Sequence, residues 1–332
     1  MLQTIYIEYK YPLFATMVIL LGILLGFGIT AVYTVIILGL LELTLSFDNA
    51  VLNAKVLQKM SPFWQTIFLT VGIAIAVIGV RFIMPSAIVS GFSDLTFMES
   101  ISLAIDNPIA YKEQLEHANP SVSMFGGTFL LCIFINFLID SKDNNWLFFE
   151  KWIQIDSDDK IEKFVGTLIF CIIFITFMSI KDTIFPAIFG FSLYYIIQFI
   201  TNKVDDIQND SASLISSGLI NFIYLEILDA SLSFDGVIGA FAITNNIVLI
   251  MAGLAIGAIF VRSMTTHVVK TGAIDEFIYL EHGAHYAIGI LAIIMGLSVS
   301  NHIPEVVTSL SAIGIIGMSF YSSIKYNKLQ TV

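Results

Sequence analysis

The sequence predicts an all-α polytopic membrane protein with about ten transmembrane helices in two inverted-topology repeats. Three observations lead to this prediction: high hydrophobicity, recurring uncharged stretches of membrane-spanning length, and an acidic motif that occurs twice. Of 332 residues, 57% are hydrophobic and only 12% are charged, with a mean hydropathy of +0.88. Soluble domains carry about 25% charged residues, so this composition fits a chain whose main solvent is lipid.

Apolar stretches recur along the whole chain, and each approaches the roughly 17 to 25 residues that cross a hydrocarbon core. The split between the first two spans is expected at Gly26-Phe27-Gly28, because residues 11–41 are too long for one tilted helix. A nine-span arrangement without this split stays open. The expected spans lie near residues 13–27, 30–54, 63–84, 121–140, 163–181, 184–201, 213–243, 247–267, 280–300 and 305–324.

Lysines are distributed unequally between the two faces of this topology. Only Lys112 and Lys181 fall on one face. Because lysine and arginine are retained on the cytoplasmic side, the distribution places both termini and the loop at 141–162 inside. The lysines on the cytoplasmic face are Lys10, Lys55, Lys59, Lys142, Lys151, Lys160, Lys163, Lys203, Lys270, Lys325 and Lys328.

Charge and cysteine content exclude other classes of protein. The net charge is −11, and the acids crowd into residues 92–121 and 140–162, so a nucleic acid would be repelled. Cys132 and Cys171 lie in apolar runs, and we interpret them as small buried hydrophobic residues rather than as a disulfide framework. The segment at 92–121 can be re-entrant, interfacial or a loop.

An internal repeat divides the chain. Residues 41–51 and 228–238 share Leu-Ser-Phe-Asp and an acid six residues before that Asp. Two likenesses follow in the same order: residues 75–81 resemble 256–262, and residues 115–118 resemble 280–283. The motifs fall on the second and seventh spans, so they enter the membrane in opposite senses, as in many secondary transporters. Two helices that look alike by chance are the alternative.

The repeat gives the expected domains. Residues 1–140 form the first repeat, with its acidic motif at 42–49. Residues 141–162 form an acidic cytoplasmic loop, and residues 163–332 form the second, inverted repeat, with its motif at 229–236.

Five acids lie within otherwise apolar segments. Each ionised carboxylate at bilayer depth costs roughly 3 kcal/mol even on the lenient insertion scale, so the five need partners, protons or a cation. One alternative is structural pairing with Arg81 and Arg262, although arginines near span ends can also snorkel. The five acids are Glu42, Asp48, Glu226, Asp229 and Asp235.

Two polar stripes follow helical spacing through the motifs. Asp48 and Asp235 lie about 100° from these stripes in an unbroken helix, so bringing them to one site requires unwinding near each Ser-Phe-Asp step. Broken helices at the midplane are where transporters bind ions. The stripes are Glu42, Ser46, Asn49 and Asn53 in the first motif, and Asp229, Ser233 and Gly236 in the second.

Glu281, His282 and His285 form a second candidate cluster, because histidines at i and i+3 put two ligands on one helical face. Metal ligation and a structural role at the interface both stay open. Oxygen and imidazole donors without thiolate favour Mn, Mg, Ca or Zn over Cu(I).

The motif residues resemble the TerC family of integral membrane proteins, in the LysE transporter superfamily. Glu42-Leu-Thr-Leu-Ser-Phe-Asp48-Asn49 is similar to its first signature, and Asp229-Ala-Ser-Leu-Ser-Phe-Asp235 to its second. Gly236-Val-Ile-Gly, where many members have Ser-Ile-Pro, indicates a divergent branch. The resemblance implies a bacterial inner-membrane protein of inverted repeats, in a family whose members export manganese or carry a tellurium-resistance name.

The resemblance implies ion-binding roles for Glu42, Asp48, Asn49, Asp229 and Asp235. A second tier of candidates comprises Ser46, Ser233, Glu226, Glu281, His282 and His285.

Taken together, the sequence predicts a secondary transporter, not an enzyme, that exports a divalent metal ion, most readily Mn²⁺, by alternating access. Protons can return on the same carboxylates. The ion is a substrate, no permanent cofactor is expected, and the expected partners are membrane lipid and the ion. One alternative is an assembly or secretion partner that docks at the acidic loop. Another is an intramembrane metalloenzyme at Glu281-His-Gly-Ala-His285, which matches neither zinc-hydrolase motif order.

Overall fold

The protein is described by a computed structural model, and every element in the part that it describes is a helix. The all-α prediction is therefore confirmed for that part. The described residues are 2–92, 94–140, 146–147, 150, 160–206, 211–244, 246–272, 277–301, 303 and 305–330. Most of the predicted cytoplasmic loop at 141–162 lies outside these residues.

The helices pack as two compact units that do not follow the two halves of the sequence. The first unit comprises Met1–Asn119 and Asn221–Thr271, and the second comprises Pro120–Ile220 and Gly272–Val332. Each unit therefore takes helices from both halves. Such packing is compatible with a duplicated chain, and the repeat boundaries expected from the sequence stay a prediction.

The first unit contains both acidic motifs. Its helices are α1 (Leu2–Phe27), α2 (Ile29–Leu45), α3 (Phe47–Gln58), α4 (Pro62–Ala74), the π-helix η1 (Ile75–Ile83), α5 (Met84–Phe92), α6 (Phe97–Asp106) and α12 (Ile247–Thr271), with the start of α7 (Pro108–Ile139) and the end of α11 (Ser211–Ile243).

The second unit holds the rest of α7 and α11. Its other helices are α9 (Lys160–Met178), the 3₁₀-helix η2 (Lys181–Thr183), α10 (Ile184–Asp206), α14 (Leu280–Ser298) and α15 (Glu305–Gln330).

Among the described residues, seven helices are long and apolar enough to cross a membrane, which fits the predicted multi-pass helical membrane protein. Large apolar side chains such as Leu25, Phe177 and Phe185 are about four-fifths exposed, at 80%, 79% and 78%, as expected for surfaces that face lipid. The ten-span count stays a prediction. The seven are Tyr9–Phe27, Pro62–Gly91, Pro108–Ile139, Ile161–Met178, Lys181–Ile200, Ile247–Thr271 and Leu280–Ser298, and Ile29–Leu43 is a shorter apolar helix.

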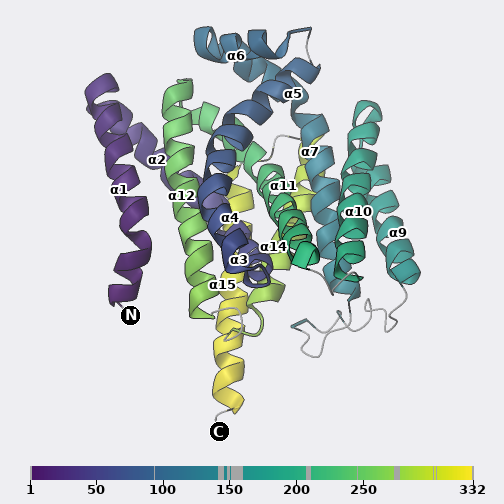
Figure 1. Cartoon of the computed structure of the whole chain (residues 1–332). Coiled ribbons are helices and arrows are strands. Elements are labelled where there is room, and N and C mark those ends of the chain that lie inside the picture. Colours follow the sequence, from purple (N-terminus) through teal and green to yellow (C-terminus); the bar gives the residue numbers. More distant parts are fainter. Residues whose placement is uncertain are drawn as a thin grey trace. The chain divides into compact units, whose positions relative to one another are not determined.

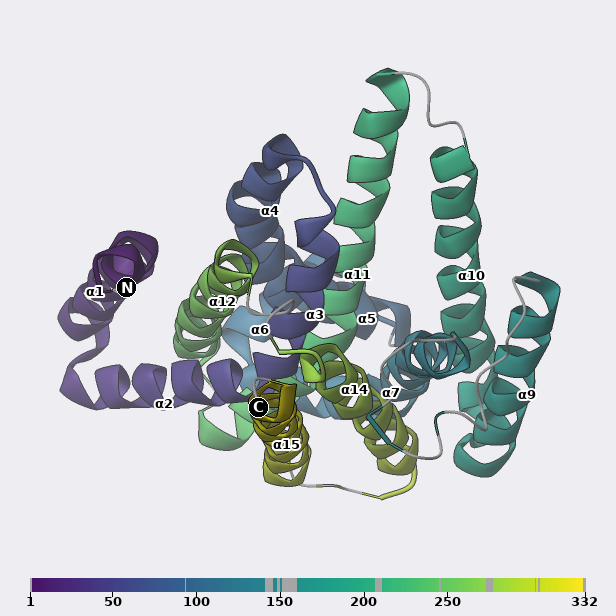
Figure 2. The same ribbon diagram turned by 90° about the horizontal axis from the view of Figure 1, so that it is seen from below.

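The expected turn between the first two spans is present. Helix α1 ends at Phe27 and α2 begins at Ile29, and Gly28 between them has a φ of 83°. That left-handed conformation favours glycine because a Cβ would be strained there. In Figure 2, α1 is seen nearly along its axis while α2 is seen from the side.

A helix break lies inside the first acidic motif. Helix α2 ends at Leu45 and α3 begins at Phe47, with Ser46 between them at φ −101° and ψ 17°. The two helices run in clearly different directions (Figure 2). Helix α11, in contrast, is continuous from Ser211 to Ile243. The predicted unwinding is therefore confirmed in the first motif. It is wrong in the second motif, where the helix is unbroken and Asp229 and Ser233 lie one turn apart on the same face.

The hydrophilic segment at 92–121 is mostly helical. Thr96 begins α6 with a capping box: its hydroxyl accepts from the Glu99 N–H, and the Glu99 carboxylate accepts from the Thr96 N–H at 2.7 Å. Such reciprocal bonds satisfy two of the N–H groups left over at a helix start. Helix α6 lies across the end of α5 (Figure 1), and α7 begins at Pro108.

Helices α2 and α12 approach closely through glycine. Gly253 and Gly257 lie one turn apart on α12, and a Cβ on Gly253 would collide with Leu38 of α2. A Cβ on Gly257 would come within 2.5 Å of the Glu42 side chain. Small residues four apart let membrane helices pack backbone to backbone. The sequence therefore positions Glu42 directly against α12.

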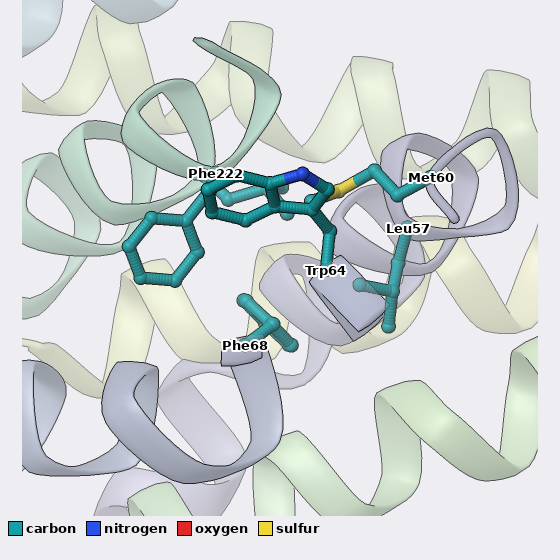
Figure 3. Close-up of a cluster of buried hydrophobic side chains, with 6 residues drawn as sticks. Leu57, Met60, Trp64, Phe68 and Phe222 are labelled. Carbon is teal, nitrogen blue, oxygen red and sulfur yellow. The ribbon is translucent and has the colours of Figure 1, made fainter. Parts of the chain in front are cut away.

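An aromatic cluster closes one side of the same unit. Trp64 and Phe68 of α4 pack with Phe222 of α11, and Leu57 and Met60 lie beside them (Figure 3). The Trp64 and Phe222 ring centroids are 5.9 Å apart. Burial of large apolar side chains contributes roughly 1.5 to 3 kcal/mol each, so this contact fixes α4 against α11 near the buried acids.

Candidate functional site

A network of buried ionised side chains lies in the first unit, built from α2, η1, α11 and α12. Arg81 and Arg262 are 2% and 3% exposed, and the acids Glu42, Glu226 and Asp229 are all buried. Snorkelling of the two arginines, one interpretation of the sequence, is wrong in this structure. Their pairing with the acids, the other interpretation, is confirmed.

Arg81 is bound mainly by Glu42. Its Nη2 donates to Glu42 Oε1, and its Nη1 donates to the Ala76 carbonyl of its own helix at 2.6 Å. The wide turn of a π-helix, with i to i+5 bonding, lets the side chain fold back on the carbonyl five residues earlier. Ser46 at the helix break donates to the same Glu42 oxygen at 2.9 Å.

Arg262 is bound by both oxygens of one carboxylate. Its Nη2 donates to both oxygens of Glu226, at 3.0 and 3.1 Å, and its Nη1 donates to the Phe68 carbonyl at 3.0 Å. The guanidinium also lies 4.0 Å from the centroid of the Phe68 ring, a favourable cation–π geometry. Gly72 makes room, since a Cβ there would collide with Arg262 and lie 2.7 Å from Glu226 Oε1.

Asp229 lies between the two arginines. Its Oδ2 is 3.8 Å from Arg81 Nη1 and 3.6 Å from Arg262 Nη2. Both distances are ion-pair contacts that are too long for hydrogen bonds. Ser233, one turn further along α11, lies 3.4 Å from Arg81 Nη2. Arg81 therefore contacts acids from both halves of the sequence.

The network relates to the internal repeat. Arg81 and Arg262 are equivalent in the likeness of residues 75–81 to 256–262, and Glu42 and Asp229 are the equivalent acids that lie six residues before each motif Asp. Glu226 is equivalent to Gly39, so the second half alone supplies an additional acid. Equivalent arginines thus have unequal sets of partners.

The structure brings together five of the predicted site residues. They are Glu42, Ser46, Glu226, Asp229 and Ser233. The backbones of Asp48 and Asn49 lie in the first turn of α3, and that of Asp235 lies in α11, but their side chains lie outside the described part.

Asn53 is a residue that the sequence placed on the polar stripe without a ligand role. It is 2% exposed on α3, and its Oδ1 has no hydrogen-bond partner among the described residues. A buried amide oxygen without a donor is rare and needs an explanation such as an ion or water. Amide oxygen is a ligand for hard cations, so Asn53 joins the candidates. The i+7 spacing from Ser46 is the signal that marks it.

The second predicted cluster does not assemble. His282 Nε2 lies 3.5 Å from Glu150 Oε2, and Glu150 also accepts from the Tyr286 hydroxyl at 3.0 Å. His285 stacks on Phe137, with ring centroids 3.8 Å apart. Within the described residues, no three His, Cys, Asp or Glu side chains are grouped so that they could hold a metal ion. The arrangement favours the structural interpretation of these histidines.

The two cysteines meet in the second unit. Both are free and buried, and the sulfurs of Cys132 on α7 and Cys171 on α9 are 3.6 Å apart. They pack as small apolar side chains, as the sequence predicted.

Residues 47–330 match a family described as a protein of unknown function, DUF475. The chain belongs to this family. No curated protein and no solved structure matches the chain. The family description assigns no activity, so the interpretation of the site depends on the buried ionic network.

Proposed function

We propose that this member of the DUF475 family is a secondary transporter that exports a divalent cation, most readily Mn²⁺. The observation that carries the proposal is the charge imbalance of the buried network. Three described carboxylates face two guanidiniums, a net of one negative charge, and we expect the motif aspartates Asp48 and Asp235 to join them. Fully ionised, five acids and two arginines leave three negative charges.

A residual negative charge inside a membrane protein is costly unless a cation or protons neutralise it. A divalent ion would neutralise two of the three charges, and a proton the third. If protons bind the same carboxylates when the ion leaves, the buried negative charge is neutralised both with and without the ion. This balance also agrees with an oxygen-rich ligand set of carboxylates and the Asn53 amide, which suits Mn²⁺, Mg²⁺ and Ca²⁺.

The backbone supports the same proposal. The break at Ser46 and the π-helix at Ile75–Ile83 both adjoin the Glu42–Arg81 pair. Interrupted helices and π-segments mark sites where membrane helices bind ions or move. Alternating access would place the site between inverted repeats in the inner membrane, with both termini cytoplasmic. The lysine distribution and the resemblance to the TerC family support this arrangement.

A second candidate is an assembly partner without transport. The close pairing of both arginines with acids favours it, because these ion pairs can stabilise a fold with no ion present. An intramembrane metalloenzyme has weaker support, since His282 pairs with Glu150 and His285 stacks on Phe137.

The test is manganese content and survival in excess Mn²⁺ of cells that lack a manganese exporter. Wild type should lower cell manganese, whereas Asp48→Asn and Asp235→Asn should reduce this effect at least about tenfold, because each removes a charge without a change in size. Asp106→Asn, at an exposed position on α6, is the matched control and should behave as wild type. If wild type changes the content of none of Mn, Zn, Ca or Mg, the transport proposal is wrong and the assembly candidate stands first.

A further inference from the structure

We propose that Arg81 is the exchangeable counter-cation of the ion-free state. The transported ion binds Glu42 only after the Arg81 guanidinium has moved away, and the guanidinium returns to Glu42 when the ion leaves. This inference rests on the proposed function, a cation transporter whose ligands include Glu42.

The physical reason lies in the return of the empty carrier. A carrier that has released its ion must reorient with its ligands unoccupied, and a bare carboxylate at bilayer depth is costly. An internal cation removes this cost at Glu42, while protons neutralise the remaining acids. It also makes net transport possible, since the protein can then return with protons on its other acids and without a second metal ion.

The two equivalent arginines differ in the acceptors that hold them. Arg262 has two hydrogen bonds to Glu226, a third to the Phe68 carbonyl and a cation–π contact. It is therefore suited to a fixed structural pair. Arg81 also has three hydrogen bonds, but only one is to a carboxylate, Glu42, while the other two are to uncharged oxygens, the Ala76 carbonyl at 2.6 Å and the Ser233 hydroxyl at 3.4 Å. Its second carboxylate, Asp229, is 3.8 Å away.

The donors of Arg81 are also incompletely used. Its Nε is buried and has no hydrogen-bond partner among the described residues. Asn53 Oδ1, on the helix that follows the break, is likewise buried without a donor in that part of the chain. An unsatisfied buried donor costs about 1 to 3 kcal/mol, so the observed position does not use the full bonding capacity of the guanidinium.

The backbone around the Arg81–Glu42 pair supports an exchange of the guanidinium for the ion. Glu42 Oε1 accepts from Arg81 and from Ser46, the residue between α2 and α3. A change of backbone angles at Ser46 would therefore alter the donors of that oxygen. Arg81 itself lies in the π-helix, where its only described backbone acceptor is the Ala76 carbonyl. Arg81 thus lies on irregular backbone and Glu42 lies in the last turn before a helix break, whereas Glu226 and Arg262 lie within regular helices.

The experiment compares two fluxes of radioactive Mn²⁺ in liposomes that contain the purified full chain. Net efflux into a medium without Mn²⁺ requires the empty carrier to return, whereas exchange against external Mn²⁺ does not. Arg81→Gln should retain exchange and lose net efflux, so that the ratio of net efflux to exchange falls at least about tenfold. Arg262→Gln removes the same charge from the fixed pair and should lower both fluxes together, with an unchanged ratio.

A purely structural role for Arg81 predicts a different result, in which Arg81→Gln also lowers both fluxes together; that result would overturn the inference. An unchanged ratio with full activity would overturn it as well. If wild type shows neither flux while it melts cooperatively, the proposed function fails first, and this outcome is distinct from any that concerns Arg81 alone.

Arg81→Lys keeps the inference testable if Arg81→Gln does not fold. Lysine keeps the charge but lacks the planar fork of donors, so Mn²⁺ should displace it more readily. The Kd for Mn²⁺, measured by calorimetry on the detergent-solubilised protein, should fall several-fold relative to wild type, with net efflux retained. An unchanged or raised Kd in a folded Arg81→Lys protein would overturn the inference.

Discussion

At the residue scale, a guanidinium has five N–H donors in one plane, and the two buried arginines use this capacity differently. Arg262 places its donors on Glu226 and on the Phe68 carbonyl of α4. It therefore joins α12 to both α11 and α4. Breaking such a buried pair by removal of one partner typically costs about 3 to 5 kcal/mol, since the other charge stays buried.

Gly72→Ala tests the space on which this pair depends. The new methyl group would collide with Arg262 and press on Glu226 Oε1, and overpacking of this kind costs about 1 to 3 kcal/mol. We expect a lower melting temperature in detergent. Gly26→Ala is the matched control, because nothing lies within 4 Å of a Cβ there, and it should keep or raise the melting temperature. Equal melting temperatures for Gly72→Ala and wild type would show that the Arg262–Glu226 pair shifts to accommodate the methyl group at no cost in stability.

Residue-scale features were only partly predictable. Burial of Glu42 and Asp229 follows from carboxylates placed in apolar segments, and the helical stripe correctly put Ser46 on the side of Glu42. Partner choice was not predictable, because Arg81 is 39 residues from Glu42 in sequence and Arg262 is 36 from Glu226. Spacing within a helix constrains neighbours only three or four residues apart, so it could not select between snorkelling and pairing.

At the element scale, the two acidic motifs have nearly the same sequence but different backbones. The first is broken at Ser46, and the second runs through α11 without interruption. The shared Leu-Ser-Phe-Asp does not decide the break, so the surrounding contacts must. Glu42 packs against Gly257 of α12, where a Cβ would collide with it, whereas the equivalent acid Asp229 lies between two guanidiniums. The sequence pattern predicted a break at both motifs because the two motifs look alike, and the tertiary contacts that distinguish them are not part of the pattern.

Helix α6 gives a prediction on pH. Hydrogen bonds from the Thr96 N–H and hydroxyl hold the pKa of Glu99 below its ordinary value. A lowered carboxylate pKa stabilises the folded form above the ordinary pKa, about 4.3, and this stabilisation is lost as pH falls through the lowered value. Amide hydrogen-exchange protection at the start of α6 should therefore decrease below pH 4.3. Glu99→Gln, which cannot titrate, should show protection that does not change with pH in this window.

At the scale of the whole molecule, composition was sufficient for the class of protein. Seven helices long and apolar enough to span a membrane coincide with predicted spans. The helices α11 and α15 coincide with two further predicted spans, although neither is among those seven. The sequence does not decide the structure of residues 92–121. Their high charge obscures the helical pattern of α6, which begins with a capping box, and of the polar first turns of α7. Packing into units that mix both halves depends on contacts that no local pattern encodes.

The inverted repeat can be tested on the whole chain with single added cysteines. Lys59 follows the first motif and Thr244 follows the second, each about ten residues beyond the motif Asp in sequence. Inverted repeats require these positions to face opposite sides of the membrane, with Lys59 on the cytoplasmic side. A membrane-impermeant maleimide should therefore label Thr244→Cys in intact cells and Lys59→Cys only in inverted vesicles. Wild type is the control and should remain unlabelled, because Cys132 and Cys171 are buried. Labelling of both variants from one side would mean that the motifs enter the membrane in the same sense, and alternating access between inverted halves would lose its structural basis.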